Sequence, residues 1–343
     1  MNRQAAAWLC SVVSGLTMLA LMPSHADAQP SKLKLRVADA FPTGHYIAEN
    51  SIRYFMDQVT RATGGAVEFE YYPAEQLGKA KDLLALTLSG VADIGYVVPS
   101  YVSDKMPLSA VAELPGLFPN SCTGAAAYWR LSRDGILAQK EYAPNGVRVL
   151  FSFVLAPYQI ATKQKFGSLR EVEGMKLRAI GAAQEVTLKR LKIVPVRMPS
   201  PEVHESMSRG TIDGAIFPYS SMLSYDLPVK YVTQGENFGT AAGHYLISEA
   251  RWETLPANVQ KAMQEAGEAT IRHGCAAFDK DVQTAMEKLR QKGTTIVTLP
   301  AEDRRLIAQT LATVANEWAE GVDRRGKPGS ETLKAFREAL SAP

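Results

Sequence analysis

The 343-residue sequence predicts an α/β fold, and three observations support that prediction. Strand-like and helix-like segments alternate from residue 32 to residue 217, as they do in parallel sheets with crossover helices. A local phrase containing a helix end, a glycine and an aspartate occurs twice. A long helical pattern, residues 256–291, follows these units without a clear break. The recurring units favour parallel strand pairs joined by right-handed connections.

The first elements set the pattern for the rest of the chain. Residues 32–38 alternate polar and apolar side chains like a half-buried strand, and residues 47–59 carry apolar side chains at helical spacing. Residues 67–71 alternate again. The same criteria predict strands at 92–98, 146–153, 175–180, 194–198 and 211–217, and helices at 81–89, 184–191 and 201–208.

The duplicated phrase covers residues 88–95 and residues 207–214. Each copy combines a helix end, a glycine, a β-branched residue, an aspartate and a second glycine. We expect the same turn to be used once in each of two similar lobes.

The C-terminal third is predicted to be helical. Residues 256–291 would extend roughly 50 Å as one straight helix, which is longer than one lobe of this size. Gly267 and Gly274 are the expected sites of a bend. A second helix is predicted after Pro300.

The N-terminus has the features of a signal peptide, residues 1–28. Arg3 precedes an apolar stretch from residue 5 to about residue 22, and Ala26 and Ala28 form the small-residue cleavage pattern. An uncleaved membrane anchor is the alternative, although polar residues dilute the apolar stretch. Cys10 lies in the middle of that stretch, which argues against a lipoprotein. Cleavage would leave a soluble periplasmic chain starting at Gln29, with no stable membrane insertion.

Cys122 and Cys275 remain after cleavage, in a compartment that permits disulfides. Pairing requires a Cα separation below about 7 Å, which the sequence does not reveal. Both alternatives stay open, and two buried free thiols are the favoured interpretation.

Catalytic signatures are missing from the sequence. It contains no G-x-S-x-G, H-E-x-x-H, P-loop or G-x-G-x-x-G motif, and its histidines lack metal-ligand spacing. His45 and His244 nevertheless lie beside predicted strand-to-loop switches, where ligand crevices form. A net charge of +3 without long basic runs argues against a nucleic-acid partner. We therefore expect a binding protein with no catalytic residue, no cofactor and no metal site.

Four segments point to one family. They are residues 72–78 (YPAEQLG), 173–178 (EGMKLR), 196–203 (VRMPSPEV) and 208–214 (SRGTIDG). In this order and spacing they resemble the extracytoplasmic solute receptors of tripartite ATP-independent periplasmic (TRAP) transporters, the DctP-type family. The resemblance extends from about Lys32 to the C-terminal helices.

The resemblance implies a two-lobed periplasmic binding protein fold. Its lobes are linked by crossing strands and by a long helix that spans both, and they close on the solute by hinge motion. The crossings would fall near residues 153–158 and 243–247. The implied boundaries are residues 29–154 plus about 245–280 for lobe I, and residues 155–244 plus about 281–343 for lobe II.

Arg178 closes the phrase whose arginine grips the solute carboxylate in the family. The two parallel N–H donors of a guanidinium match the two oxygens of a carboxylate. The sequence departs from the family pattern at Tyr158, aligned with an arginine, and at Phe217, aligned with an asparagine. We therefore expect one firm carboxylate anchor and more apolar walls.

The expected pocket is lined mainly by aromatic side chains. The candidates are Arg178, Tyr158, Phe217, His45, Phe41, Tyr96, Tyr101, Tyr219 and Tyr245. Such a lining suits an aromatic or otherwise apolar monocarboxylate better than a sugar acid or a C4-dicarboxylate.

The leading hypothesis is a TRAP receptor that binds a small organic acid and delivers it to the membrane subunits of a permease. One alternative is the same fold acting as a ligand sensor for a membrane kinase. Another is an exported enzyme that uses the same cleft.

Overall fold

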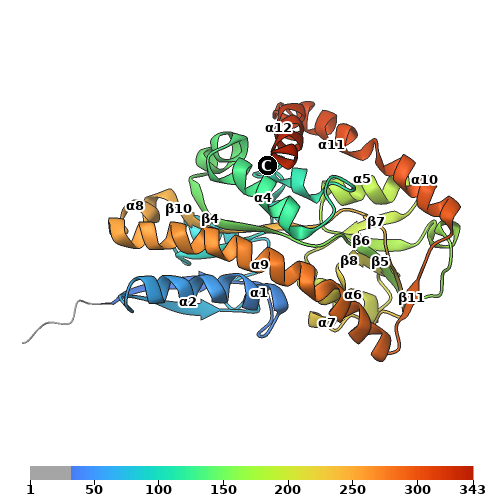
Figure 1. Cartoon of the computed structure of the whole chain (residues 1–343), viewed down its shortest axis with the longest axis horizontal. Helices are drawn as coiled ribbons and strands as arrows, with labels where there is room; N and C mark the ends of the chain where they lie inside the picture. Colours follow the sequence, from blue (N-terminus) through green and yellow to red (C-terminus); the bar gives the residue numbers. More distant parts are fainter. Residues whose placement is uncertain (1–31, 343) are drawn as a thin grey trace, which may run out of the picture. The chain divides into compact units, whose positions relative to one another are not determined.

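The computed structural model describes residues 32–342, which form two β-sheets flanked by helices and spanned by helix α9 (Ala257–Gln291) (Figure 1). The predicted signal peptide, residues 1–28, lies outside the described residues. The mixed architecture confirms the predicted α/β class.

The first sheet has five strands in the order β2-β1-β3-β10-β4. β1 pairs in parallel with β2 and β3, whereas β10 runs antiparallel between β3 and β4. The bounds are β1 (Leu33–Ala38), β2 (Val67–Tyr72), β3 (Ile94–Val97), β4 (Val147–Val154) and β10 (Ala242–Ser248).

The second sheet has six strands in the order β11-β9-β5-β8-β6-β7. β6 pairs in parallel with β7 and β8, whereas β5 runs antiparallel to β8 and β9. The bounds are β5 (Gln159–Thr162), β6 (Lys176–Ala179), β7 (Val194–Arg197), β8 (Gly214–Phe217), β9 (Tyr231–Thr233) and β11 (Thr295–Val297).

Helices surround both sheets. Those before α9 are α1 (Tyr46–Asn50), α2 (Ile52–Ala62), α3 (Leu83–Leu88), α4 (Ser121–Arg133), α5 (Ala182–Arg190), α6 (Val203–Ser208), α7 (Tyr219–Ser224) and α8 (Glu249–Glu253). Those after it are α10 (Ala301–Leu311), α11 (Val314–Asp323) and α12 (Gly329–Ser341). Short turns of 3-10 or π helix are η1 (Pro99–Val102), η2 (Leu108–Glu113), η3 (Ala138–Tyr142), η4 (Ala143–Asn145), η5 (Leu169–Val172) and η6 (Ser200–Glu202).

Most predicted elements occur where the sequence places them, with two kinds of exception. The helix predicted after Pro300 is two helices, α10 and α11. Helices α4, α7, α8 and α12 and the short strands β5, β9 and β11 were not predicted. No helix within residues 32–342 is long and apolar enough to cross a membrane.

The duplicated phrase forms the same turn in both sheets, as predicted. Gly90 and Gly210 adopt left-handed φ angles of +74° and +75°, which a glycine tolerates without strain. The following aspartate then caps the neighbouring parallel strand. Oδ2 of Asp93 accepts a hydrogen bond from the backbone N–H of Arg36 at 2.8 Å, and Oδ2 of Asp213 accepts one from Lys176 at 2.7 Å.

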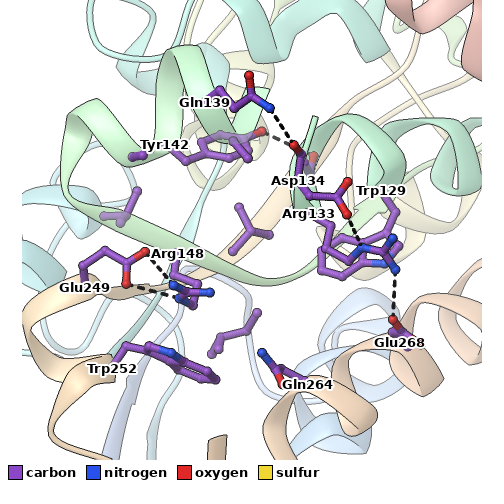
Figure 2. A pocket seen from close by; sticks show the side chains of 16 residues that line it. Trp129, Arg133, Asp134, Gln139, Tyr142, Arg148, Glu249, Trp252, Gln264 and Glu268 are labelled. Carbon is purple, nitrogen blue, oxygen red and sulfur yellow. Dashed lines mark hydrogen bonds and ion pairs between the residues drawn. The ribbon is translucent and has the colours of Figure 1, made fainter. Parts of the chain in front are cut away.

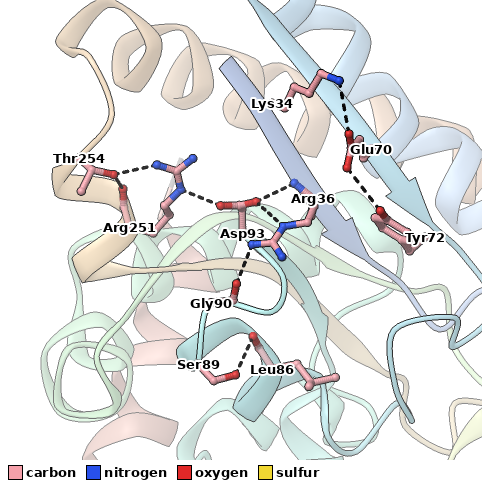
Figure 3. A network of polar contacts seen from close by, with 10 residues as sticks. All are labelled: Lys34, Arg36, Glu70, Tyr72, Leu86, Ser89, Gly90, Asp93, Arg251 and Thr254. Carbon is pink, nitrogen blue, oxygen red and sulfur yellow. Dashed lines mark hydrogen bonds and ion pairs between the residues drawn. The ribbon is translucent and has the colours of Figure 1, made fainter. Parts of the chain in front are cut away.

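In the first sheet this turn carries further polar contacts (Figure 3). The buried carboxylate of Asp93 also accepts a hydrogen bond from Nε of Arg251 at 2.7 Å. Nη2 of Arg36 donates to the carbonyl oxygen of Gly90 at 2.7 Å. Asp93 is therefore paired with two arginines, which accounts for its burial as a charged group and ties β1 and α8 to this turn.

Helix α9 is one continuous helix of 35 residues. A Cβ atom at Gly267 would lie 2.2 Å from the carbonyl oxygen of Leu150 in β4, and one at Gly274 would lie 3.0 Å from that of Asn50 at the end of α1. The two glycines therefore allow the helix backbone to approach its neighbours closely.

Cys122 and Cys275 form a disulfide between α4 and α9, with a Cα separation of 4.8 Å. The interpretation of two free thiols is therefore wrong. The carboxylate of Asp279 supports the same junction, because its oxygens accept hydrogen bonds from the backbone N–H groups of Ser121 at 2.7 Å and Cys122 at 3.1 Å. Two cysteines far apart in the sequence meet because α4 begins beside the middle of α9.

Candidate functional site

Arg178, in β6, is completely buried although it carries a charge. Its Nε donates to the carbonyl oxygen of Met198 at 3.1 Å, and its Nη2 donates to Oγ of Ser200 at 3.0 Å. Its Cζ lies 4.7 Å from the centre of the Phe217 ring, which is a cation–π contact. Nη1 is buried and has no hydrogen-bond partner among residues 32–342. One charged donor of the guanidinium therefore remains available.

The second sheet brings the predicted anchor and walls together. In the parallel pair β6 and β8, Arg178 lies opposite Ala215, and Phe217 ends β8 two residues later. Tyr158 directly precedes β5, whose first residue pairs with Phe217. The rings of Tyr158 and Phe217 stack at 6.0 Å. Arg178, Tyr158 and Phe217 thus lie together at one edge of the sheet, where ligands bind in α/β folds.

Tyr101, in η1, reaches this edge from the first sheet. Its hydroxyl accepts a hydrogen bond from the backbone N–H of Ser200 at 2.9 Å and lies 3.5 Å from Nη2 of Arg178. The two lobes therefore contact each other beside the guanidinium.

His45 begins α1 and caps it. Its Nδ1 accepts a hydrogen bond from the backbone N–H of Ile47 at 3.2 Å, while its Nε2 is buried without a partner within the described part of the chain. Its ring stacks on Phe41 at 4.4 Å and meets Tyr225 at 4.8 Å. Burial lowers the pKa of His45 to about 3, so the ring is neutral at physiological pH.

Tyr225 connects the aromatic residues of the two lobes and was missing from the sequence-based candidates. Its ring lies 6.0 Å from that of Phe217 in the second lobe and 4.8 Å from that of His45 in the first. Phe41 continues the cluster to Tyr96, at 4.5 Å. Tyr225 follows the short helix α7 and ends no strand, so the criterion of strand-end position could not select it.

Two buried carboxyl groups lie near these rings. Asp39 accepts hydrogen bonds from the hydroxyls of Tyr71 at 2.8 Å and Tyr245 at 2.7 Å, and burial raises its pKa to about 6. Glu113 accepts a hydrogen bond from the hydroxyl of Ser100, while its Oε1 is buried without a partner in the described chain. Burial raises the pKa of Glu113 to about 8, against the opposing charge of Arg178.

Three of the sequence candidates have other contacts. Tyr245 stacks on Phe151 at 4.9 Å inside the first sheet, and its ring meets that of Tyr96 at 5.5 Å. The hydroxyl of Tyr219 donates to the carbonyl oxygen of Thr233 at 2.8 Å, and the residue lines a pocket of about 830 Å³ beside α9, which Tyr46 also lines. His244 lies in the core of the first lobe, where its Nε2 is 2.8 Å from the Tyr128 hydroxyl.

Another pocket, of about 520 Å³, lies on the first lobe between α4, η3, β4, α8 and α9 (Figure 2). Arg148 there forms an ion pair with Glu249 at 3.1 Å and lies over the ring of Trp252 at 5.1 Å. Arg133 pairs with Glu268 at 3.3 Å. Because both arginines already have carboxylate partners, this pocket offers a weaker anion site than the surroundings of Arg178.

Comparison with known proteins identifies the family. Residues 38–321 match the model of the bacterial extracellular solute-binding protein, family 7, also called DctP. The chain belongs to this family. The C4-dicarboxylate-binding periplasmic protein DctP of Rhodobacter capsulatus is 24% identical over 345 residues, covering 95% of this chain and 96% of that protein.

Solved structures of TRAP solute-binding proteins share the fold. One from Rhodoferax ferrireducens, in complex with copurified benzoate, has a TM-score of 0.83 and 24% identity, covering 90% of this chain and 98% of that one. Another, from a marine metagenome and specific for aromatic acid ligands, was crystallised with 3-hydroxybenzoate. It has a TM-score of 0.83 and 25% identity, with coverages of 90% and 98%.

These matches confirm the predicted family and two-lobed fold of a TRAP solute-binding protein. DctP-family proteins and these structural neighbours are transport proteins. Residues 32–342 contain no group of three or more His, Cys, Asp or Glu side chains placed to hold a metal ion.

Proposed function

We propose that this protein is the periplasmic receptor of a TRAP transporter for a small aromatic or apolar monocarboxylate, held by Arg178 between the lobes. The observation that carries the proposal is the free Nη1 of the buried Arg178 guanidinium. A buried charged donor without a partner is costly. A solute carboxylate would satisfy this donor with a charge-assisted hydrogen bond.

The surrounding rings support an aromatic or apolar solute. Phe217 lies against the guanidinium, Tyr158 stacks on Phe217, and Tyr225 meets Phe217 edge-on. A flat ring attached to the carboxylate can pack between such side chains, whereas a sugar acid would leave its hydroxyls without partners. The neighbours bound to benzoate and 3-hydroxybenzoate favour the same class.

Solute release and delivery would depend on lobe motion. The proposed lobes comprise residues 29–154 plus about 245–280, and residues 155–244 plus about 281–343. They would separate to release the solute and close over it to form the surface that the membrane permease subunits recognise. The contact between Tyr101 and Ser200 would then form on closure. This chain would supply affinity, and an ion gradient across the permease would supply energy.

Calorimetric titration of the mature chain, from Gln29 onward, with benzoate tests the anchor. Arg178→Ala should weaken binding about tenfold to a hundredfold, because a hydrogen bond to a charged group contributes about 1.5–3 kcal/mol. Arg178→Lys keeps the charge without the planar pair of donors and should weaken binding less. Arg190→Ala is the matched control, since Arg190 pairs with Glu317 on the surface. Unchanged affinity in a folded Arg178→Ala protein would refute the anchor.

The solute class requires a separate measurement. Thermal shifts with benzoate, succinate and a sugar acid should show stabilisation by benzoate alone, and a ligand at a hundred times its Kd should contribute about 2.7 kcal/mol. A response to succinate or the sugar acid alone would leave the receptor in place and refute the aromatic class.

A further inference from the structure

The imidazole of His45 offers a second unsatisfied donor within the same aromatic cluster. Its Nδ1 accepts the hydrogen bond from Ile47 N–H at 3.2 Å, so in the neutral ring the hydrogen resides on Nε2. That Nε2 is buried, and nothing in residues 32–342 accepts its hydrogen bond. The helix cap therefore fixes both the tautomer and the orientation of a donor that a ligand can use.

This donor differs in character from the guanidinium. The imidazole is packed against the rings of Phe41, Tyr46 and Tyr225, at 4.4, 5.2 and 4.8 Å. Because burial lowers the pKa of His45 to about 3, Nε2–H is a neutral donor at pH 7. The neutral imidazole carries no charge to balance a second carboxylate, so a neutral oxygen is the more favourable acceptor for its Nε2–H.

The side chains that carry the two free donors make different direct contacts. The guanidinium of Arg178 contacts Met198, Ser200, Tyr101 and Phe217, whereas the ring of His45 contacts Phe41, Tyr46 and Tyr225. The rings of Phe217 and Tyr225, 6.0 Å apart, connect the two groups of contacts. A solute carboxylate held by the guanidinium would leave the His45 donor for another part of the ligand.

We propose that the solute is an aromatic monocarboxylate with a neutral oxygen acceptor, such as a ring hydroxyl, away from its carboxylate, and that His45 Nε2–H donates to this oxygen. The inference rests on the proposed function and narrows its solute class. An analogue without the oxygen leaves the His45 donor buried and unpaired, and it should bind several-fold more weakly.

The test compares benzoate with 3-hydroxybenzoate and 4-hydroxybenzoate by calorimetry on the mature chain. The unmodified protein should bind at least one hydroxybenzoate about threefold to tenfold more tightly than benzoate. In His45→Asn this preference should fall to about one. Asparagine is a good helix cap and preserves α1, but it lacks the Nε2–H donor. His273→Asn is the matched control, because His273 is an exposed histidine of α9, and it should retain the preference.

Two results would overturn the inference. One is a hydroxybenzoate preference that survives in His45→Asn. The other is equal weakening of benzoate and both hydroxybenzoates, which would place His45 at the carboxylate or give it a purely structural role. Arg178→Ala tests the proposed function independently, because loss of benzoate binding there concerns the anchor and not the ring substituent.

Discussion

Tyr101 and Ser200 join the two lobes at the edge of the candidate site. The Tyr101 hydroxyl accepts a hydrogen bond from the Ser200 backbone N–H at 2.9 Å and lies 3.0 Å from Oγ of Ser200. Tyr101 follows β3 of the first sheet, and Ser200 follows β7 of the second. Oγ of Ser200 also accepts a hydrogen bond from Nη2 of Arg178 at 3.0 Å. The inter-lobe contact and the proposed anchor therefore share one residue.

Tyr101→Phe should weaken acid binding about threefold to tenfold, because it removes one acceptor that favours the closed arrangement and leaves the Ser200 N–H unpaired. Stopped-flow measurement of benzoate release should show most of the change in the dissociation rate. Tyr54→Phe is the control, since the Tyr54 ring stacks on His273 away from the site. Equal release rates for Tyr101→Phe and the unmodified protein would contradict a role in closure.

The sequence predicts the features that depend on local pattern. The two copies of the duplicated phrase lead to equivalent aspartate contacts at Asp93 and Asp213, because the glycine, the turn and the capping residue lie within a few positions. The strands carrying Arg178 and Phe217 were also predictable, since KLRA alternates charged and apolar side chains and GAIF is a short apolar run that begins at a glycine.

Features that depend on long-range packing were not predictable. Tyr225 meets His45 only because the lobes approach each other, and the disulfide requires α4 to begin beside α9. Tyr219 illustrates the converse, because its position near a strand end placed it among the candidates while its hydroxyl donates to Thr233 in another part of the lobe. A single sequence contains no direct record of such distances.

Gly267→Ala should destabilise the protein although alanine favours helices. The added Cβ would lie 2.2 Å from the carbonyl oxygen of Leu150, so α9 or β4 would have to move. Overpacking of this kind costs about 1–3 kcal/mol, which exceeds the gain of up to about 1 kcal/mol in helix propensity. The urea midpoint should therefore fall.

Gly321→Ala provides the matched control for that experiment. Gly321 lies within α11, and its added Cβ would meet only the flexible end of Arg324, at 3.7 Å. Its urea midpoint should stay level or rise because only the helix propensity changes. A Gly267→Ala midpoint that rises equally would show that α9 has free space beside β4.

Glu113→Gln should reduce the loss of stability between pH 5 and pH 8. Burial raises the pKa of Glu113 from 4.5 to about 8, so across this range the folded protein holds a proton that the unfolded chain has released. Stability therefore falls as the pH rises through this range, by about 1.4 kcal/mol for each pH unit in which the two states differ by a full proton. Glutamine has no proton to release, so its contribution to the free energy of unfolding stays constant with pH.

Urea unfolding of both proteins at pH 5 and pH 8 measures how much stability each one loses over this range. Asp39 and Glu141 titrate in both proteins, so their effects cancel. An equal fall in stability for the two proteins would mean that the neighbouring charge of Arg178 keeps Glu113 ionised at neutral pH.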